Sequence, residues 1–158
     1  MLEVFESADG AGVESQLEKY GNAVTVTEGE SMRPFLKTKR DVVVLKRLDS
    51  PLKKYDVVLY KVDGKYIMHR VIGVTDGGKV LVIRGDNTFV REYVPCERIM
   101  ARLVSFTRAG KGGTVEDRRY KLYSVIWNSI YPVRFILQLP KAAFRRAFRA
   151  LGKIRNKK

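Results

Sequence analysis

The sequence is poor in the residues that most often build cross-links and metal centres. Of its 158 residues, one is cysteine, Cys96, and one is histidine, His69. A single cysteine cannot form an internal disulfide, and a structural zinc site needs several Cys or His ligands. We therefore expect no disulfide, no metal and no other cofactor. Cys96 has no second histidine to activate it, so we interpret it as an incidental thiol rather than a nucleophile.

Long apolar runs are also missing before Ser31. The first ten residues are acidic and contain neither the basic start nor the apolar core of a secretory signal peptide. Nothing ahead of Ser31 approaches the ~20 apolar residues that a membrane span needs. We expect no signal peptide and no transmembrane segment, and hence a cytoplasmic protein.

Acidic residues are absent from the last 41 positions, which hold 12 Lys and Arg residues. The first 117 residues contain 19 Lys and Arg against 17 Asp and Glu, so most of the net charge of +14 belongs to the tail. A basic appendage on a nearly neutral domain favours anionic partners, such as lipid head groups or nucleic acid.

Short β-branched and aromatic runs separated by turn residues predict a mainly β domain. Two Asp-Gly turns, within residues 62–65 and 75–78, are strong hairpin signals and predict antiparallel pairing. The expected strands are 24–27, 41–46, 56–61, 65–74, 79–84 and 99–108.

The composition predicts four segments. Residues 1–22 form an N-terminal segment with one short amphipathic helix that ends at Gly21. Residues 23–108 form the β domain, and residues 109–117 are glycine-rich and predict a flexible linker. Residues 118–158 form a basic, helical C-terminal tail.

The tail is apolar over residues 120–139, but Pro132 and several polar residues interrupt it, so we do not expect it to span a bilayer. After Pro140, Phe144 and Phe148 fall on one face of a predicted helix and arginines on the other. Three interpretations remain open: peripheral binding to an anionic inner membrane surface, packing on the β domain, and non-specific attraction to nucleic acid. Specific nucleic-acid binding is not expected, because no helix-turn-helix or stacking platform is visible.

One turn, residues 28–36, stands out between two strand-prone runs. Gly29 permits a sharp bend and Pro34 fixes the backbone, so Ser31 is presented on a rigid turn. An ordinary turn serine is one interpretation. The other is a nucleophile, which would need a neighbouring base because a serine hydroxyl is weakly nucleophilic at neutral pH.

His69, in the predicted strand 66–72, is the only histidine that could serve as that base. A third group must orient the imidazole ring. Asp86 follows a strand on a glycine turn and could hold the ring in the required tautomer. It could equally be a structural turn residue.

These residues resemble the successive conserved boxes of the signal peptidase I family, in the branch that uses Ser-His-Asp. The boxes are Gly29-x-Ser31-Met32-x-Pro34, His69-Arg70-Val71 and Gly85-Asp86-Asn87. Residues 52–58 are similar to a further box, although Tyr55 replaces the usual glycine. The resemblance covers about residues 24–108, and the order and spacing of the boxes make it specific.

The resemblance implies the coiled antiparallel β fold that signal peptidases share with LexA-type peptidases. It implies a serine endopeptidase that cleaves a precursor or leader peptide, with Ser31 as nucleophile, His69 as general base and Asp86 as orienting acid. Members often carry a second acid shortly after that box, where this chain has Glu92, so Glu92 is the alternative orienting acid. Gly29, Met32 and Pro34 are the expected substrate-binding residues.

A second function belongs to a different class. The fold could serve as a non-catalytic binding or regulatory module that acts through its basic tail on membrane or nucleic acid. The joint presence of Ser31, His69 and Asp86 favours the peptidase, because a module without catalysis would have no reason to keep all three.

Overall fold

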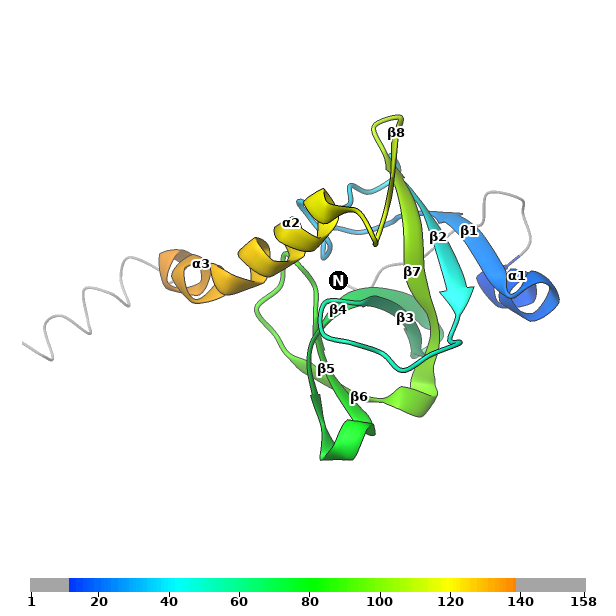
Figure 1. The fold of residues 1–158 in the computed structure, drawn as a ribbon, viewed down its shortest axis with the longest axis horizontal. Helices are drawn as coiled ribbons and strands as arrows, with labels where there is room; N and C mark the ends of the chain where they lie inside the picture. Colours follow the sequence, from blue (N-terminus) through cyan, green and yellow to red (C-terminus); the bar gives the residue numbers. More distant parts are fainter. Residues whose placement is uncertain (1–11, 139–158) are drawn as a thin grey trace, which may run out of the picture. The chain divides into compact units, whose positions relative to one another are not determined.

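The computed structural model describes residues 12–138, and Figure 1 shows their arrangement. The chain divides into two compact units, with the boundary after Asn128. In order, the elements are α1 (Val13–Tyr20), β1 (Asn22–Val26), β2 (Val42–Arg47), β3 (Val57–Val62), β4 (Lys65–Thr75), β5 (Val80–Arg84), β6 (Glu92–Pro95), β7 (Ile99–Arg108), β8 (Lys111–Thr114), α2 (Arg118–Ser129) and α3 (Tyr131–Gln138), with short 3-10 turns at Asp76–Gly78 and Cys96–Arg98.

The first unit is built on one antiparallel sheet, which confirms the mainly β prediction. The strand order is β1-β2-β7-β3-β4-β5-β6, and β8 pairs with β7. The turn between β3 and β4 has positive φ at both Asp63 (48°) and Gly64 (77°), as expected of a tight hairpin turn. Strand β6 was not expected from the sequence, because residues 92–95 are few and carry a proline.

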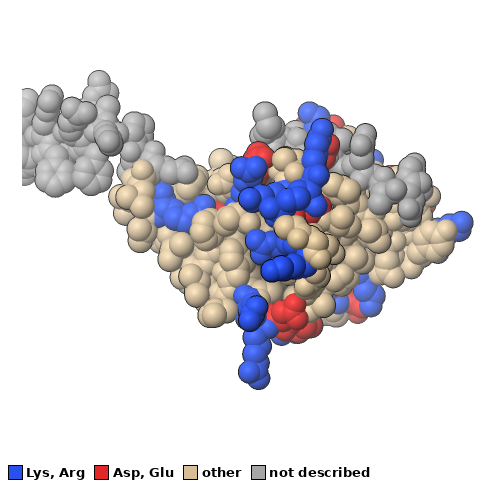
Figure 2. Space-filling view, turned by 90° about the horizontal axis from the view of Figure 1, so that it is seen from above, with Lys and Arg blue, Asp and Glu red and all other residues tan. Residues whose placement is uncertain are grey.

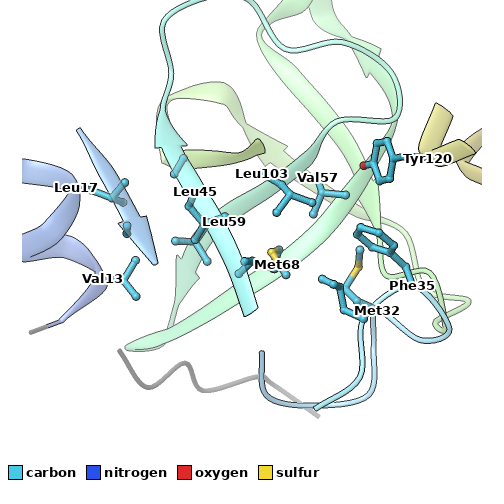
Figure 3. Close-up of a cluster of buried hydrophobic side chains, with 14 residues drawn as sticks. Val13, Leu17, Met32, Phe35, Leu45, Val57, Leu59, Met68, Leu103 and Tyr120 are labelled. Atoms are coloured by element: carbon cyan, nitrogen blue, oxygen red, sulfur yellow. The ribbon is translucent and has the colours of Figure 1, made fainter. Parts of the chain in front are cut away.

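Two hydrophobic cores lie on opposite faces of β3 and β4. Side chains of successive strand residues point to opposite faces. Val57 and Leu59 therefore join the larger core, while Val58 and Tyr60 join the smaller one. Both faces are covered, and all four residues are fully buried. Figure 3 shows the larger core, which runs from α1 through the sheet to Tyr120 of α2.

The segment 109–117, predicted as a flexible linker, instead continues the sheet. Its residues 111–114 form β8 and pair with β7 from Ser105 to Arg108. The backbone N–H of Val115 then donates to the carbonyl oxygen of Val104 at 3.1 Å. The glycines in this segment serve a close hairpin: a Cβ at Gly113 would lie 2.8 Å from the ring of Phe106. Glycine content therefore indicated tight packing here rather than flexibility.

The beginning of the predicted tail is part of the first unit. In α2, Tyr120 and Ser124 are buried, with 8% and 1% of their surfaces exposed. Both side-chain oxygens accept hydrogen bonds from Arg70 of β4, at 3.0 and 2.9 Å. The predicted helix after Pro140 lies outside the described residues. No helix among residues 12–138 combines the length and apolar character needed to cross a membrane.

Candidate active site

Ser31 lies in the turn between β1 and β2, and the turn is fixed on both sides of it. The backbone N–H of Gly29, at φ 85°, donates to Thr38 Oγ1 at 3.0 Å. After Ser31, the side chains of Met32 and Phe35 enter the larger core, with 2% and 1% of their surfaces exposed. Burial of these two anchors holds the backbone of the turn in place. Met32, predicted to bind substrate, is instead a core residue, whereas Pro34 is exposed.

Ser31 and His69 meet as the sequence predicted. His69 lies on β4, paired with Val58 of β3, and its ring extends on the face of the smaller core. The distance between Ser31 Oγ and His69 Nε2 is 3.0 Å. Only 9% of Ser31 and 6% of His69 is exposed. A hydroxyl and an imidazole at this distance form a hydrogen bond along which the serine proton can pass to the ring.

Gly85 allows this approach. A Cβ built on Gly85 would lie 2.7 Å from the carbonyl oxygen of Ser31 and 3.0 Å from His69 Nε2. Any side chain at this position would therefore collide with both candidate catalytic residues. Two residues later, the backbone N–H of Asn87 donates to the same Ser31 carbonyl at 2.6 Å. The Gly85-Asp86-Asn87 segment thus packs directly against the serine turn.

The carboxylate beside His69 belongs to Glu92, at the start of β6. Its Oε1 lies 3.1 Å from His69 Nδ1. The hydroxyl of Tyr60 donates to Glu92 Oε2 at 2.7 Å, and the Tyr60 oxygen lies 3.1 Å from the same Nδ1. Because Glu92 and the Tyr60 oxygen are both acceptors facing Nδ1, the arrangement favours a proton on Nδ1. Nε2 is then left as the acceptor for Ser31.

Contacts with the ring keep Glu92 ionised. The hydrogen bond with His69 lowers the pKa of the Glu92 carboxyl below its ordinary value, and the hydrogen bond from Tyr60 adds to this effect. Burial opposes this lowering of the pKa, but it is only partial, because one third of the Glu92 side chain remains exposed. An ionised carboxylate can orient a neutral imidazole and stabilise the imidazolium that forms when the ring takes a proton.

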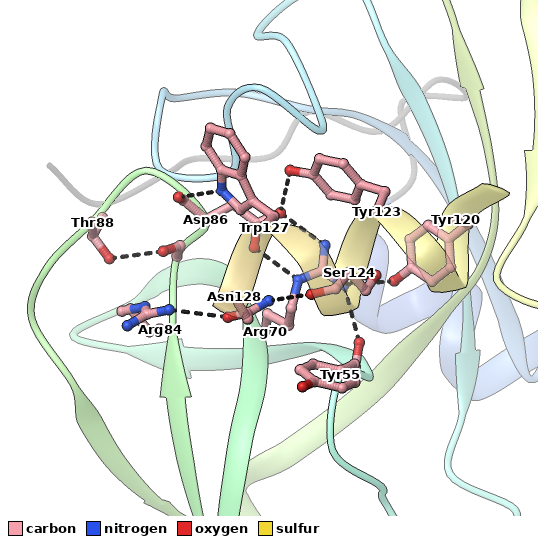
Figure 4. A network of polar contacts seen from close by, with 11 residues as sticks. Tyr55, Arg70, Arg84, Asp86, Thr88, Tyr120, Tyr123, Ser124, Trp127 and Asn128 are labelled. Carbon is pink, nitrogen blue, oxygen red and sulfur yellow. Dashed lines mark hydrogen bonds and ion pairs between the residues drawn. The ribbon is translucent and has the colours of Figure 1, made fainter. Parts of the chain in front are cut away.

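Asp86, predicted as the orienting acid, has a different position and partner. Its Oδ1 and Oδ2 accept from Nε and Nη2 of Arg70, at 2.7 and 2.8 Å. The two side chains are 0% and 1% exposed, so this is a fully buried, two-pronged ion pair (Figure 4). The attraction of Asp86 raises the pKa of the Arg70 guanidinium above its ordinary value, although burial acts in the opposite direction. The prediction for Asp86 is therefore corrected in favour of Glu92.

The Arg70–Asp86 pair fastens α2 to the sheet. Tyr123 donates its hydroxyl to Asp86 Oδ2 at 3.0 Å, and Trp127 donates its indole N–H to the Asp86 carbonyl at 2.8 Å (Figure 4). Burial, and then the nearby Asp86 charge, raise the pKa of Tyr123 far above its ordinary value, so it remains a neutral donor. Asp86 thus helps to fix the segment that packs against Ser31.

Sequence reasoning missed Tyr60, and it gave no role to Arg70 and Gly85, although both stand in the boxes that carry the resemblance. A signal for the first was present, because the hairpin turn at Asp63-Gly64 fixes the register of β3 against β4. That register pairs Val58 with His69, which puts Tyr60 on the same face, one pleat away. The partners of Arg70 lie up to 54 positions away in the chain and gave no local signal.

No family model matches the chain, and no curated protein matches its sequence. Among the described residues, no group of three or more His, Cys, Asp or Glu side chains is placed to hold a metal ion.

Proposed function

We propose that the protein is a serine endopeptidase in which Ser31, His69 and Glu92 carry the reaction. The observation that supports this most directly is the continuous line of contacts from Ser31 Oγ to His69 Nε2 at 3.0 Å and from His69 Nδ1 to Glu92 at 3.1 Å. Nucleophile, base and orienting acid stand in the order that triad chemistry requires.

The proposed reaction begins with attack of Ser31 Oγ on the scissile carbonyl carbon while His69 Nε2 takes the hydroxyl proton. Glu92 stabilises the resulting imidazolium, with Tyr60 holding the carboxylate. The imidazolium then donates its proton to the leaving amine nitrogen, and the peptide bond breaks to give an acyl-enzyme. Water, deprotonated by His69, hydrolyses the ester and restores Ser31.

For the substrate, we propose a precursor or leader peptide, bound in extended form. The resemblance to signal peptidase I at the Ser31 and His69 boxes supports this class and favours small residues before the cleaved bond. An extended peptide can add to an exposed sheet edge, and backbone hydrogen bonds then hold it in register. The end strand β1 leads directly into the Ser31 turn. Its Val24 N–H already donates to Gln16 Oε1 of α1 at 2.9 Å, so we propose that a substrate pairs with the residues between Val24 and Ser31.

The test is labelling with a fluorophosphonate probe, which reacts with activated serines. We expect the wild-type protein to be labelled and Ser31→Ala and His69→Ala to remain unlabelled while keeping the wild-type melting temperature. Ser50→Ala, which alters an exposed serine, is the matched control and should label normally. Undiminished labelling of Ser31→Ala would show that the assignment is wrong. Cleavage of a peptide library would then define the residues around the bond.

The alternative, a non-catalytic module of this fold, predicts a different outcome. Wild-type protein would show no labelling and no cleavage, although it would still bind its partner. The hydrogen-bonded Ser31–His69 pair favours the peptidase, because burying both groups in contact serves no evident need of the fold.

We also propose that the basic tail attaches the protein to an anionic membrane surface. Residues 129–158 contain nine Lys and Arg and no acidic residue. In α3, Phe135, Ile136 and Leu137 are 45%, 51% and 78% exposed, which leaves apolar area available for contact with lipid. Apolar burial and attraction of basic residues to anionic lipid, about 1 kcal/mol per residue near the surface, both favour such binding.

Vesicle co-sedimentation tests this attachment. The full chain should bind vesicles containing phosphatidylserine, bind phosphatidylcholine vesicles weakly, and lose binding as salt rises. A chain that ends at Asn128 keeps all of α2 except its last residue, Ser129, together with the contacts of α2 to the sheet, so it should retain probe labelling and lose vesicle binding. Equal binding of the full chain to both vesicle types, or binding to neither, would exclude the proposal.

A further inference from the structure

A basic cavity lies in the first unit, between the β7–β8 hairpin, the first turns of α2 and the loop that follows Phe35. Its volume is about 780 Å³. The β7–β8 hairpin that borders it lies toward the top of Figure 1. Figure 2 shows the molecule from that side, with Lys and Arg side chains gathered in the middle of the view. Six of its lining residues are cationic: Lys37, Arg40, Arg108, Lys111, Arg118 and Arg119.

The cavity is separate from the candidate active site. Ser31, His69 and Glu92 do not line it. Phe35 and Tyr123 do line it. Phe35 belongs to the same loop as Ser31, and Tyr123 donates a hydrogen bond to Asp86. The triad proposed above therefore leaves the cavity without a role.

Most of the positive charge in the cavity is not neutralised by the protein. Asp41 pairs with Arg40. Asp117, the one acidic residue among the described residues of the lining, accepts hydrogen bonds from the backbone and hydroxyl of Thr114. Within residues 12–138, no carboxylate lies within ion-pair distance of the other five cations. Like charges gathered in a concave surface repel one another and focus a positive potential, which an anion would relieve.

Arg108 contributes a donor that faces no acceptor. Its Nε atom is buried and has no hydrogen-bond partner among the described residues. The rest of the guanidinium is held in place, because Nη2 donates to the carbonyl oxygen of Pro34 at 3.3 Å and the group lies 5.5 Å from the centre of the Phe35 ring. A buried donor without an acceptor is costly, and native proteins rarely leave one unsatisfied.

The inner wall of the cavity is aromatic and rigid. Phe35 lies edge-on to Phe106, with ring centres 4.9 Å apart, and stacks with Tyr123 at 5.7 Å. Tyr120 packs against both phenylalanine rings. Such a wall offers apolar contact to part of a ligand while the cations at the mouth bind its charged part.

We propose that this cavity binds a phosphate group carried by an organic molecule. Five unneutralised cations suit a group that carries up to two negative charges and several acceptor oxygens better than a single carboxylate, and guanidinium groups match phosphate oxygens in pairs. The volume exceeds that of inorganic phosphate and lies in the range of small-molecule sites. The aromatic wall accommodates the organic part, which is either a lipid glycerol with its chains or a soluble phosphomonoester.

The test uses a position that reports on charge alone. Gly112 lines the cavity, has an ordinary negative φ, and a Cβ built there meets nothing within 4 Å. Gly112→Asp therefore places a carboxylate at the cavity without a clash, and Gly112→Asn is its uncharged match in size. Binding of glycerol 1-phosphate to the full chain, measured by calorimetry at constant ionic strength, should weaken at least tenfold in the Asp variant relative to the Asn variant.

Two further comparisons sharpen the result. Lys111→Gln with Arg119→Gln should weaken binding, whereas Lys65→Gln with Lys79→Gln, which removes two exposed cations elsewhere, should not. Monomeric dihexanoyl phosphatidic acid that binds at least tenfold more tightly than glycerol 1-phosphate would identify a lipid as the source, and equal affinity would identify a soluble phosphomonoester. Absence of saturable binding to both probes, or equal affinity of the Asp and Asn variants, would overturn the proposal.

Discussion

Two polar clusters lie one residue apart on β4 and differ in almost every physical respect. His69 belongs to the first, with Ser31, Tyr60 and Glu92, and Arg70 belongs to the second, with Asp86 and α2. Because successive strand residues point to opposite faces, the His69-Arg70 dipeptide supplies both clusters. We name them the serine cluster and the arginine cluster.

The serine cluster keeps its groups free to exchange a proton. Its hydroxyl and imidazole share one hydrogen bond, and a third of its carboxylate side chain is exposed. In the arginine cluster, both oxygens of Asp86 are occupied by Arg70, and the pair is closed off from solvent. A carboxylate that is fully engaged in this way holds elements together, whereas one with a single ring contact can respond to a change in the charge of that ring.

The largest difference between the two clusters is expected when the acid of each is neutralised in turn. Glu92→Gln should lower turnover by roughly 10²- to 10⁴-fold, because an amide beside Nδ1 no longer fixes the tautomer or stabilises the imidazolium. Asp86→Asn should retain far more of the turnover of folded protein. The measurement is single-turnover labelling by the fluorophosphonate probe, normalised to folded protein. If Asp86→Asn is the slower variant, the roles assigned to the two clusters are reversed.

The next largest effect concerns stability. Asp86→Ala leaves the Arg70 guanidinium buried without its counter-charge, and removal of one partner of a buried ion pair costs about 3–5 kcal/mol. We expect a lower midpoint in urea, with probe labelling lost only as the protein unfolds. Replacement of both partners, Arg70→Met with Asp86→Leu, should recover much of the loss. A double variant no more stable than the single one would show that the network to α2, rather than the unpaired charge, dominates.

The contrast between the clusters also marks what the sequence could predict. Ser31 and His69 were found because a serine on a rigid turn and the only histidine of the chain are each recognisable locally. The strands on either side of Ser31 and the strand that carries His69 were predicted to within a few residues, since β-branched runs and Asp-Gly turns are local signals. The physical cause of each of these features lies in residues that are close together in the sequence.

The choice between Asp86 and Glu92 as the acid beside His69 could not be made from such local signals. Asp86 follows a glycine and stands where the resemblance indicated an orienting acid, but Arg70 competes for it on the opposite face of β4. Burial of an arginine requires a carboxylate nearby, and that demand arises only after α2 has covered the sheet. The linker prediction was wrong for a similar reason, since Gly113 lies against the ring of Phe106 and residues 111–114 pair with β7, neither of which a local pattern reveals.

Gly85 connects the two clusters, and substitution there should affect both. Gly85→Ala adds a methyl group 2.7 Å from the Ser31 carbonyl and 3.0 Å from His69 Nε2, so the serine turn must shift. We expect a loss of about 1–3 kcal/mol in the free energy of unfolding, typical of overpacking, together with strongly reduced labelling. The matched control is Gly73→Ala on β4, where a Cβ would meet Val82 at an ordinary 3.7 Å. Equal behaviour of the two variants would argue against a tight contact at Gly85.

A smaller change removes one hydroxyl from the serine cluster. Tyr60→Phe keeps the buried ring and deletes the contacts to Glu92 at 2.7 Å and to His69 at 3.1 Å. A hydrogen bond to a charged group contributes about 1.5–3 kcal/mol, and water can partly replace it at the exposed edge of Glu92, so we expect about a tenfold loss of turnover. KM should be unchanged, because Tyr60 orients the base through Glu92. Tyr66→Phe, on the neighbouring strand, is the control and should be neutral for turnover.

The smallest expected effect is the pH dependence of stability contributed by Glu92. Its pKa is lowered in the folded protein, chiefly by the hydrogen bond with His69, from an ordinary value of 4.5. The folded state therefore holds the Glu92 proton less tightly than the unfolded state does. The resulting stabilisation is fully present above pH 4.5 and is lost as the pH falls through the lower, folded value. Glutamine does not titrate, so the gap in unfolding free energy between wild type and Glu92→Gln should be wider at pH 6 than at pH 3. Urea titrations at the two pH values measure that gap.

The control repeats the titrations in a His69→Ala background, where the largest cause of the pKa shift is gone. The difference between the gap at pH 6 and the gap at pH 3 should then become smaller. A gap of the same width at both pH values, or narrowing that is unchanged by His69→Ala, would mean that the contact between Glu92 and the ring does not bias ionisation, and the serine cluster would lose its orienting acid.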